Sequence, residues 1–214
     1  MAFGKPTDGV ISKYINRRIS GVITKALLKV HKNPSPNKIT IFTTLFGIFS
    51  SFFYILKRPI IAGILIQLAS ILDGVDGEVA RILNKKTKFG GFLDSLLDRL
   101  VDISVIVCLS YFVLTSTLFP AEKLFIISFM ALSGSILVSF TNARAEASLG
   151  MHPKYFRIPP IATRDVRLFL IFLGSLLGFY IETLILIAVL SYIYVFMVLI
   201  RAYMLNKKGL FEQG

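Results

Sequence analysis

The sequence contains a single cysteine, Cys108, only two histidines and no tryptophan. A lone cysteine excludes a disulfide framework, and we expect Cys108, which lies in an apolar run, to be a packing residue. The scarcity of cysteine and histidine argues against a zinc site, because those residues are the usual zinc ligands. Acidic residues are also few, with 12 Asp and Glu against 24 Lys and Arg.

Three sequence features that would divide or redirect the chain are missing. The first 35 residues have no apolar central region and no small-residue cleavage site, so we expect the first membrane span to act as its own insertion signal. Strand signals are missing too, because the apolar stretches are too long and do not alternate. No linker, repeat or low-complexity segment is visible. We therefore predict one all-helical domain over residues 1–214.

The sequence is unusually rich in long apolar runs. Hydrophobic residues make up 55% of it and the mean hydropathy is +0.73, which is unusual for a soluble domain. Six uncharged apolar runs account for this excess: Ile39–Leu56, Ile60–Leu72, Ile103–Pro120, Leu124–Ala143, Leu168–Ile181 and Leu184–Ile200. Four of them have the length of a bilayer span, and we expect the two shorter ones to extend through polar neighbours or to end at a cavity. The prediction is an all-α integral membrane protein with six transmembrane helices over residues 36–205 and a tail over 206–214.

The N-terminal segment has a different pattern. Apolar residues recur at helical spacing from Val10 to Val30, and basic residues fill much of the remaining face. This pattern predicts an amphipathic helix over part of residues 1–35 that lies in the membrane surface. The segment Asn33–Asn37 contains two prolines that end the helix, and Pro36 is suited to begin the first span.

The net charge of +12 follows the same topology. With six spans and a cytoplasmic N-terminus, most basic residues fall on the cytoplasmic side, and only Lys57, Arg58 and Lys123 fall on the other. This positive-inside distribution predicts that both termini and the acidic segment described next face the cytoplasm. Because it explains most of the charge, it argues against nucleic acid as a partner.

Four aspartates on two predicted neighbouring helices are the candidate catalytic and metal-binding residues. Asp73 and Asp76 are three residues apart, and Asp94 and Asp98 are four apart, so each pair shares a helix face. Carboxylates beside membrane spans are costly and are functional candidates by default. Two antiparallel helices can direct all four at one point, where a divalent cation would offset their repulsion. Oxygen ligands suit Mg²⁺, Mn²⁺ or Ca²⁺.

Two alternatives remain open for these acids. They can form structural ion pairs with Arg81, Arg99 and Lys88, although this explains one or two acids rather than four at regular spacing. They can also bind the permeating ion of a cation transporter. Against transport, the acids lie near the cytoplasmic end rather than the membrane midplane, beside arginines that would repel cations.

Eight residues with fixed gaps resemble the signature of the CDP-alcohol phosphotransferases. These residues are Asp73, Asp76, Gly77, Ala80, Arg81, Gly90, Asp94 and Asp98. The amphipathic N-terminal helix and the six spans resemble the family as well. The resemblance implies Mg²⁺-dependent transfer of a phosphoalcohol group from a CDP-alcohol to a hydroxyl acceptor, with release of CMP. It further implies two metal ions, with Mn²⁺ as a substitute, and a homodimer.

The resemblance also implies roles for individual residues. The metal ligands would be Asp73, Asp76, Asp94 and Asp98, and Asp98 would also be the general base that takes the acceptor's proton. The implied CDP-binding residues are Asp73, Gly77, Ala80, Arg81, Pro36, Asn37 and Thr40.

Three arginines flank the loop between the fourth and fifth predicted spans. Arg144, Arg164 and Arg167 lie near the level of the aspartates, and the planar guanidinium binds phosphate through two donors. We therefore expect a phosphorylated acceptor. The alternative is that these arginines only anchor helix ends at lipid headgroups.

Two segments resemble particular members of this family. Ala143–Gly150 resembles the corresponding segment of family members that use inositol phosphate, and residues 5–20 resemble the membrane domain of di-myo-inositol-phosphate-phosphate synthases. Those enzymes take CDP-inositol and are often fused to a cytidylyltransferase, so we expect a separate cytidylyltransferase as a partner here. The alternative within the family is a phospholipid synthase that uses CDP-diacylglycerol or CDP-archaeol with inositol phosphate or glycerol phosphate.

Overall fold

The computed structural model describes residues 9–211, and every regular element in that range is helical. In chain order the elements are the π-helical turn η1 (Ser12–Asn16), α1 (Arg17–Val30), α2 (Pro36–Ile55), α3 (Pro59–Ile82), α4 (Lys88–Ser116), α5 (Ala121–Leu149), the 3₁₀ turn η2 (Pro153–Phe156), α6 (Arg164–Leu177) and α7 (Tyr180–Asn206). The all-helical prediction is confirmed for this range. Residues 5–8 of the N-terminal resemblance and 212–214 of the predicted tail lie outside it.

Local sequence signals explain where the helices begin and end. Both α2 and α3 begin on a proline, whose missing N–H leaves no helical bond unmade in the first turn. The side chain of Thr87 caps α4, because its Oγ1 accepts a 2.9 Å hydrogen bond from the backbone N–H of Gly90. Gly150 and Gly178 end α5 and α6 with φ of 64° and 80°, which glycine adopts without strain.

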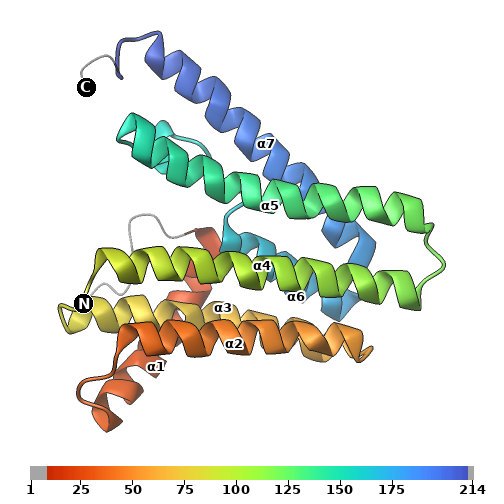
Figure 1. Cartoon of the computed structure of the whole chain (residues 1–214), viewed down its shortest axis with the longest axis horizontal. Helices are drawn as coiled ribbons and strands as arrows, with labels where there is room; N and C mark the ends of the chain where they lie inside the picture. Colours follow the sequence, from red (N-terminus) through yellow and green to blue (C-terminus); the bar gives the residue numbers. More distant parts are fainter. Residues whose placement is uncertain (1–8, 212–214) are drawn as a thin grey trace.

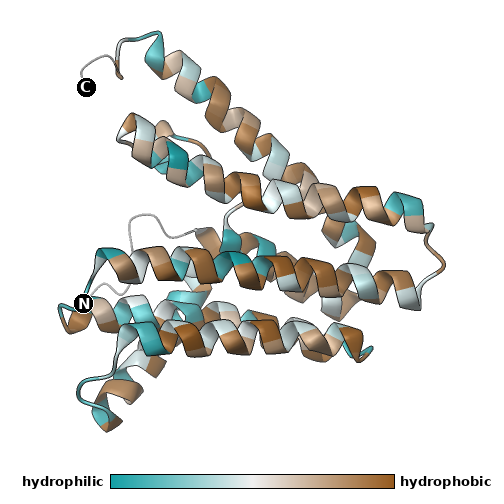
Figure 2. Cartoon of the chain, in the orientation of Figure 1, coloured by the Kyte–Doolittle hydropathy of each residue, from teal (hydrophilic) through white to brown (hydrophobic). Residues whose placement is uncertain are grey.

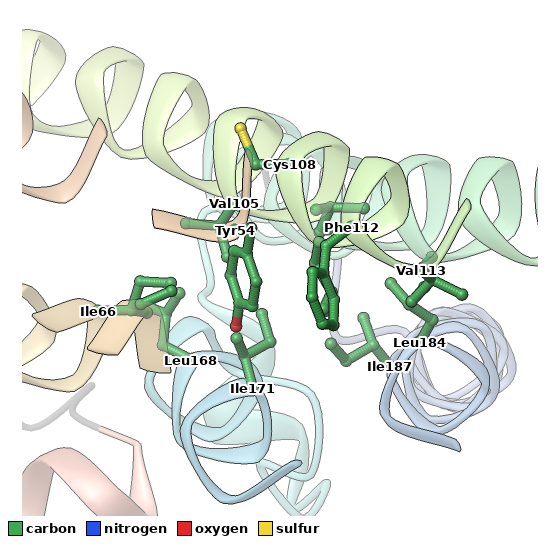
Figure 3. Packing of buried hydrophobic residues seen from close by; sticks show 14 of the residues in the cluster. Tyr54, Ile66, Val105, Cys108, Phe112, Val113, Leu168, Ile171, Leu184 and Ile187 are labelled. Carbon is green, nitrogen blue, oxygen red and sulfur yellow. The ribbon is translucent and has the colours of Figure 1, made fainter. Parts of the chain in front are cut away.

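The helices form two groups joined through a shared core. α2 packs against α3 and α4, while α5 packs against α7, and α6 lies against α3 and α7 (Figure 1). The core between them contains Ile66, Val105 and Ile187, which Figure 3 shows in the neighbourhood of Tyr54. The Tyr54 hydroxyl is buried there, 2.5 Å from Ser175 Oγ, which links α2 to α6.

Four helices described by the structure, α2, α3, α5 and α7, are long and apolar enough to cross a membrane. α4 has 29 residues, but its N-terminal half carries the acidic motif. α6 has 14 residues, or about 21 Å at 1.5 Å per residue. That is shorter than a hydrocarbon core of about 30 Å. The count of six spans therefore stays a prediction.

The outer surface of the bundle is apolar. Phe49 on α2, Phe125 on α5 and Phe196 on α7 are each more than half exposed. Figure 2 shows hydrophobic residues dominating one half of α3 and α4, and hydrophilic residues gathered in the half on the left. A surface of this kind is unfavourable in water and suits contact with lipid tails.

The predicted N-terminal helix is present as η1 followed by α1, and it packs on α3. Its buried face is polar and contains Asn16, Ser20 and Thr24. Ile19 and Val22 on the outward face are 44% and 66% exposed. The helix therefore turns small polar residues toward the protein, while its outward face carries apolar residues together with the basic Arg18, Lys25 and Lys29.

Candidate active site

Three of the four predicted aspartates converge. Asp73 comes from α3, and Asp94 and Asp98 come from successive turns of α4. Each contributes a carboxylate oxygen, and these three oxygens lie within 4.8 Å of one another. Three hard oxygen donors at this separation fit a divalent cation such as Mg²⁺ or Mn²⁺.

The fourth aspartate faces a different neighbour. Asp76 is buried, and its Oδ2 accepts a hydrogen bond from Thr40 Oγ1 of α2. Its Oδ1 accepts from the backbone N–H of Gly77. Asp76 therefore joins α3 to the beginning of α2 and is not part of the three-carboxylate cluster.

A cavity of about 260 Å³ lies beside Asp76 and Asp94, between the N-terminal turns of α2 and α4 and the C-terminal half of α3. It is lined by six of the seven predicted CDP-binding residues: Pro36, Asn37, Thr40, Gly77, Ala80 and Arg81. Asp73, the seventh, belongs to the carboxylate cluster instead. The structure thus brings together residues from positions 36 to 94, and we call this space the nucleotide cavity.

Gly90, one of the two glycines of the signature, lies where a side chain would crowd this cavity. A Cβ at Gly90 would lie 3.1 Å from Asn37 Oδ1 and 3.0 Å from Thr87 Oγ1. The absence of a side chain lets the first turns of α2 and α4 approach closely. Lys85 and Lys86 also line the cavity, and the sequence analysis did not single them out. Their only sequence signal is their place in the basic turn between the two acidic helices.

Arg164, at the start of α6, lies among the carboxylates. Its Nη1 is 2.8 Å from Asp73 Oδ2 and 3.0 Å from Asp98 Oδ1, and its Nε is 3.2 Å from Asp102 Oδ1. One guanidinium therefore bridges α3 and α4. Its donors are close enough to the cluster to bind a phosphate that approaches Asp98.

Arg167 has a different environment from Arg164. It is 3% exposed, its Nη2 lies 2.7 Å from Asp102 Oδ2 and its Nη1 donates a 2.6 Å hydrogen bond to the Ala162 carbonyl. Arg164 and Arg167 thus share Asp102, but of these two only Arg164 also pairs with Asp73 and Asp98. Arg144 is exposed on α5 and lines neither the nucleotide cavity nor the cavity described next.

Asp102 is a central residue that the sequence analysis left without a role. It is 4% exposed and lies within 4.0 Å of Arg99, Arg164 and Arg167. Ser135 Oγ also donates to it at 3.4 Å. Its position one turn after Asp98 was the available signal.

A second cavity, of about 680 Å³, opens beside Asp98 between α4 and α5. Its polar lining residues are Ser95, Asp98, Arg99, Ser139, Asn142, Glu146 and His152. The Nε of Arg99 is buried and has no hydrogen-bond partner within residues 9–211. Burial lowers the pKa of His152, an effect that Glu146 partly opposes. Apolar residues of α4 and α5 make up the rest of the wall: Phe92, Leu96, Ile136, Phe140 and Ala143. We call this space the α4–α5 cavity, and its hydroxyl, amide and charged groups are suited to bind a polyol.

Comparisons with known proteins fit this arrangement. A family model described as CDP-alcohol phosphatidyltransferase matches residues 34–202. The chain is 36% identical to a bifunctional IPC transferase and DIPP synthase of Thermococcus kodakarensis over 76% of its own length and 36% of the relative's. It is 34% identical to the protein of the same name from Aquifex aeolicus, over 94% and 45%. The chain thus spans less than half the length of these relatives.

A shorter relative is matched over most of its length. The archaetidylinositol phosphate synthase of Pyrococcus horikoshii is 35% identical over 74% of this chain and 78% of its own. Among solved structures, the phosphatidylinositol phosphate synthase PgsA1 of Mycobacterium tuberculosis with CDP-DAG bound superposes with a TM-score of 0.73. It covers 87% of this chain and 94% of its own at 24% identity, a likeness that shows a shared fold.

Proposed function

The chain belongs to the CDP-alcohol phosphatidyltransferase family, and from this premise we propose that it transfers a phosphoalcohol group from a CDP-alcohol to a phosphorylated polyol, with inositol phosphate as the acceptor. One observation carries the proposal. Asp73, Asp94 and Asp98 converge between a cavity lined by the signature residues and the α4–α5 cavity, whose wall includes several hydroxyl, amide and charged groups. A donor and an acceptor can therefore meet at Asp98, which lines the α4–α5 cavity.

The reaction assigns each group a task. The acceptor hydroxyl forms a bond to the phosphorus that carries the alcohol, the bond from that phosphorus to the CMP oxygen breaks, and CMP leaves. Asp98 takes the hydroxyl proton as the bond forms. Divalent metal bound at Asp73, Asp94 and Asp98 would offset negative charge on the pyrophosphate and on the leaving CMP. Arg164 would hold the acceptor phosphate beside Asp98.

Asp76 belongs to the proposed site mainly as a residue of the nucleotide cavity. Its hydrogen bond to Thr40 and its place in the nucleotide cavity support a role in shaping the donor site. A second metal ion would bring it into the ligand set, as the family signature implies. Lys85 and Lys86, which line the same cavity, supply positive charge for the donor's phosphates.

A membrane setting follows from the same reasoning. We propose a single domain with six spans, an N-terminal helix in the membrane surface, and both termini and the active site on the cytoplasmic side. The apolar outer faces of α2, α5 and α7 and the positive-inside distribution of Lys and Arg support this proposal. A homodimer and a separate cytidylyltransferase stay predictions.

A lipid donor is the second candidate, and a specific feature favours it. A largely apolar cavity of about 530 Å³ lies between α1, α2 and α3, and its lining includes Leu27, Phe42 and Leu72, with Lys38 also in its wall. It adjoins the first turn of α2, which also lines the nucleotide cavity. A CDP-linked lipid can place its head in one cavity and an apolar chain in the other, whereas CDP-inositol would leave the apolar cavity to membrane lipid.

The decisive experiment is CMP release by the detergent-purified chain with inositol phosphate. CDP-inositol, CDP-diacylglycerol and CDP-archaeol are compared as donors, each with and without Mg²⁺, and Asp94→Asn is the negative control. We expect Mg²⁺-dependent release with one donor class and none from the variant. If no donor releases CMP with inositol phosphate, glycerol phosphate, free inositol or serine, the proposed transfer is ruled out. Cation flux in liposomes would then test the transporter alternative.

A further inference from the structure

A carboxylate that takes no part in the proposed reaction is buried behind the active site. Glu78 of α3 is 1% exposed. Its Oε1 accepts a 2.5 Å hydrogen bond from Ser20 Oγ and lies 3.3 Å from Arg17 Nη1, and its Oε2 accepts a 2.6 Å bond from Thr24 Oγ1. All three partners come from α1. A buried carboxylate is tolerated only when it is paired and hydrogen-bonded, so Glu78 requires α1 in its docked position.

The same contact reaches the backbone beside a proposed metal ligand. Arg17 Nη1 donates a 3.1 Å hydrogen bond to the carbonyl oxygen of Gly74, the residue after Asp73. A Cβ on Gly74 would collide with the Arg17 guanidinium, so the glycine makes room for this bond. One turn earlier, Asn16 Nδ2 donates to Ser70 Oγ at 3.1 Å. η1, through Asn16, and α1, through Arg17, thus hold α3 on both sides of Asp73.

The other end of the N-terminal helix, in η1, contacts the first turn of α6, which carries Arg164. The backbone N–H of Ser12 donates a 2.7 Å hydrogen bond to Asp165 Oδ2, and Asp165 follows Arg164 directly. The N-terminal helix therefore contacts Gly74 and Asp165, which follow Asp73 and Arg164 in the chain. α3 packs mainly on α2, α6 and α1, so its register toward α4 depends on these neighbours.

We infer that Glu78 and Arg17 are positioning residues, through which the N-terminal helix holds the α3 turn of Asp73 in register with Asp94 and Asp98 of α4. This inference rests on the metal site of the proposed function. It gives the surface helix a second role, because its docked state determines whether three carboxylates from two helices meet. Groups that orient ligands without touching the ion typically change metal affinity by 10- to 100-fold when removed.

The test is Mn²⁺ binding to the detergent-purified full chain, followed by the electron paramagnetic resonance signal of free Mn²⁺. Glu78→Gln keeps the side chain's size and removes its charge, and we expect Mn²⁺ affinity to fall by about 10-fold. Thr24→Val is a milder variant that removes one donor, and a smaller loss is expected. The matched control is Tyr54→Phe, which breaks the buried bond to Ser175 in the core away from the site.

The outcomes separate this inference from the proposed function. If the wild-type chain binds no Mn²⁺, the metal site itself is wrong. If wild type binds Mn²⁺ and both α1-contact variants bind it equally well, the positioning role is refuted while the metal site stands. If Tyr54→Phe lowers Mn²⁺ affinity as much as Glu78→Gln at a similar loss of thermal stability, the effect is general destabilisation and the inference fails. We expect Tyr54→Phe to lower the melting temperature alone.

Discussion

Arg164 Nη1 lies 2.8 Å from Asp73 Oδ2, which joins the first turn of α6 to α3 across the carboxylate cluster. The same nitrogen lies 3.0 Å from Asp98, the proposed base, while Nε contacts the buried Asp102. Asp102 therefore holds the guanidinium at Nε, while Nη1 of the same guanidinium faces Asp73 and Asp98. This geometry makes Arg164 the arginine best located to bind an acceptor phosphate.

Replacing Arg164 with Gln should mainly raise the acceptor KM. Loss of a charge-assisted hydrogen bond costs about 1.5–3 kcal/mol. That corresponds to roughly a 10- to 150-fold increase in KM. Steady-state kinetics with inositol phosphate at saturating donor and Mg²⁺ measures it, and Arg18→Gln, which removes an exposed charge on α1, is the control. An unchanged KM for Arg164→Gln would assign this arginine to the carboxylates alone.

Replacing Asp98 with Asn should lower kcat by roughly 10²- to 10⁴-fold, because Asn has the same size but cannot accept the proton. Affinity for the CDP-alcohol, measured directly at saturating Mg²⁺, should stay near the wild-type value. This split between chemistry and binding distinguishes a base from a residue that only shapes the donor site. Normal turnover by Asp98→Asn would show that another group takes the proton.

Replacing Arg167 with Gln should act on stability. Arg167 and Asp102 are both buried and lie 2.7 Å apart, and removing one partner of such a pair costs about 3 kcal/mol. Thermal unfolding in detergent measures the loss, and we expect a lower melting temperature with a nearly unchanged acceptor KM in the folded fraction. A stable variant with a strongly raised KM would restore Arg167 to the phosphate-binding set.

Removal of divalent metal should abolish activity, because the converging carboxylates cannot hold a charged pyrophosphate between them without a cation. We expect no CMP release in excess EDTA and full recovery with Mg²⁺ or Mn²⁺. Assays before and after chelation and readdition on the same preparation control for irreversible loss. Turnover that continues in excess chelator would exclude the metal site.

The topology is tested by cysteine labelling in a Cys108→Ala background. A cysteine at Lys123, in the first turn of α5, should react with an impermeant maleimide from outside intact cells. A cysteine at Lys86, between α3 and α4, should react only after the membrane is opened. Labelling of position 123 from the cytoplasmic side alone would contradict the six-span arrangement.

The helical class, the family and the residues of the signature were predictable from the sequence. Uncharged runs and proline at helix starts are local properties, so the beginnings of α2 at Pro36 and of α3 at Pro59 could be read from them. The end of α3 at Ile82 lies ten residues beyond its apolar run and could not. The gaps between Asp73 and Asp98 depend on helix geometry alone, and three of the four carboxylates that they single out converge in the structure. The roles of these carboxylates stay predictions.

Which of these residues meet depends on packing between helices, because residue spacing along a helix does not reveal how the helix is rotated against its neighbours. Asp76 is hydrogen-bonded to Thr40 of α2, whereas Asp73, Asp94 and Asp98 converge. Arg164 and Arg167 look alike in sequence, yet one turn of α6 directs the first toward Asp73 and buries the second against Asp102. The pairing of Glu78 with α1 spans more than 50 residues, and no local pattern encodes a contact formed by packing across that distance.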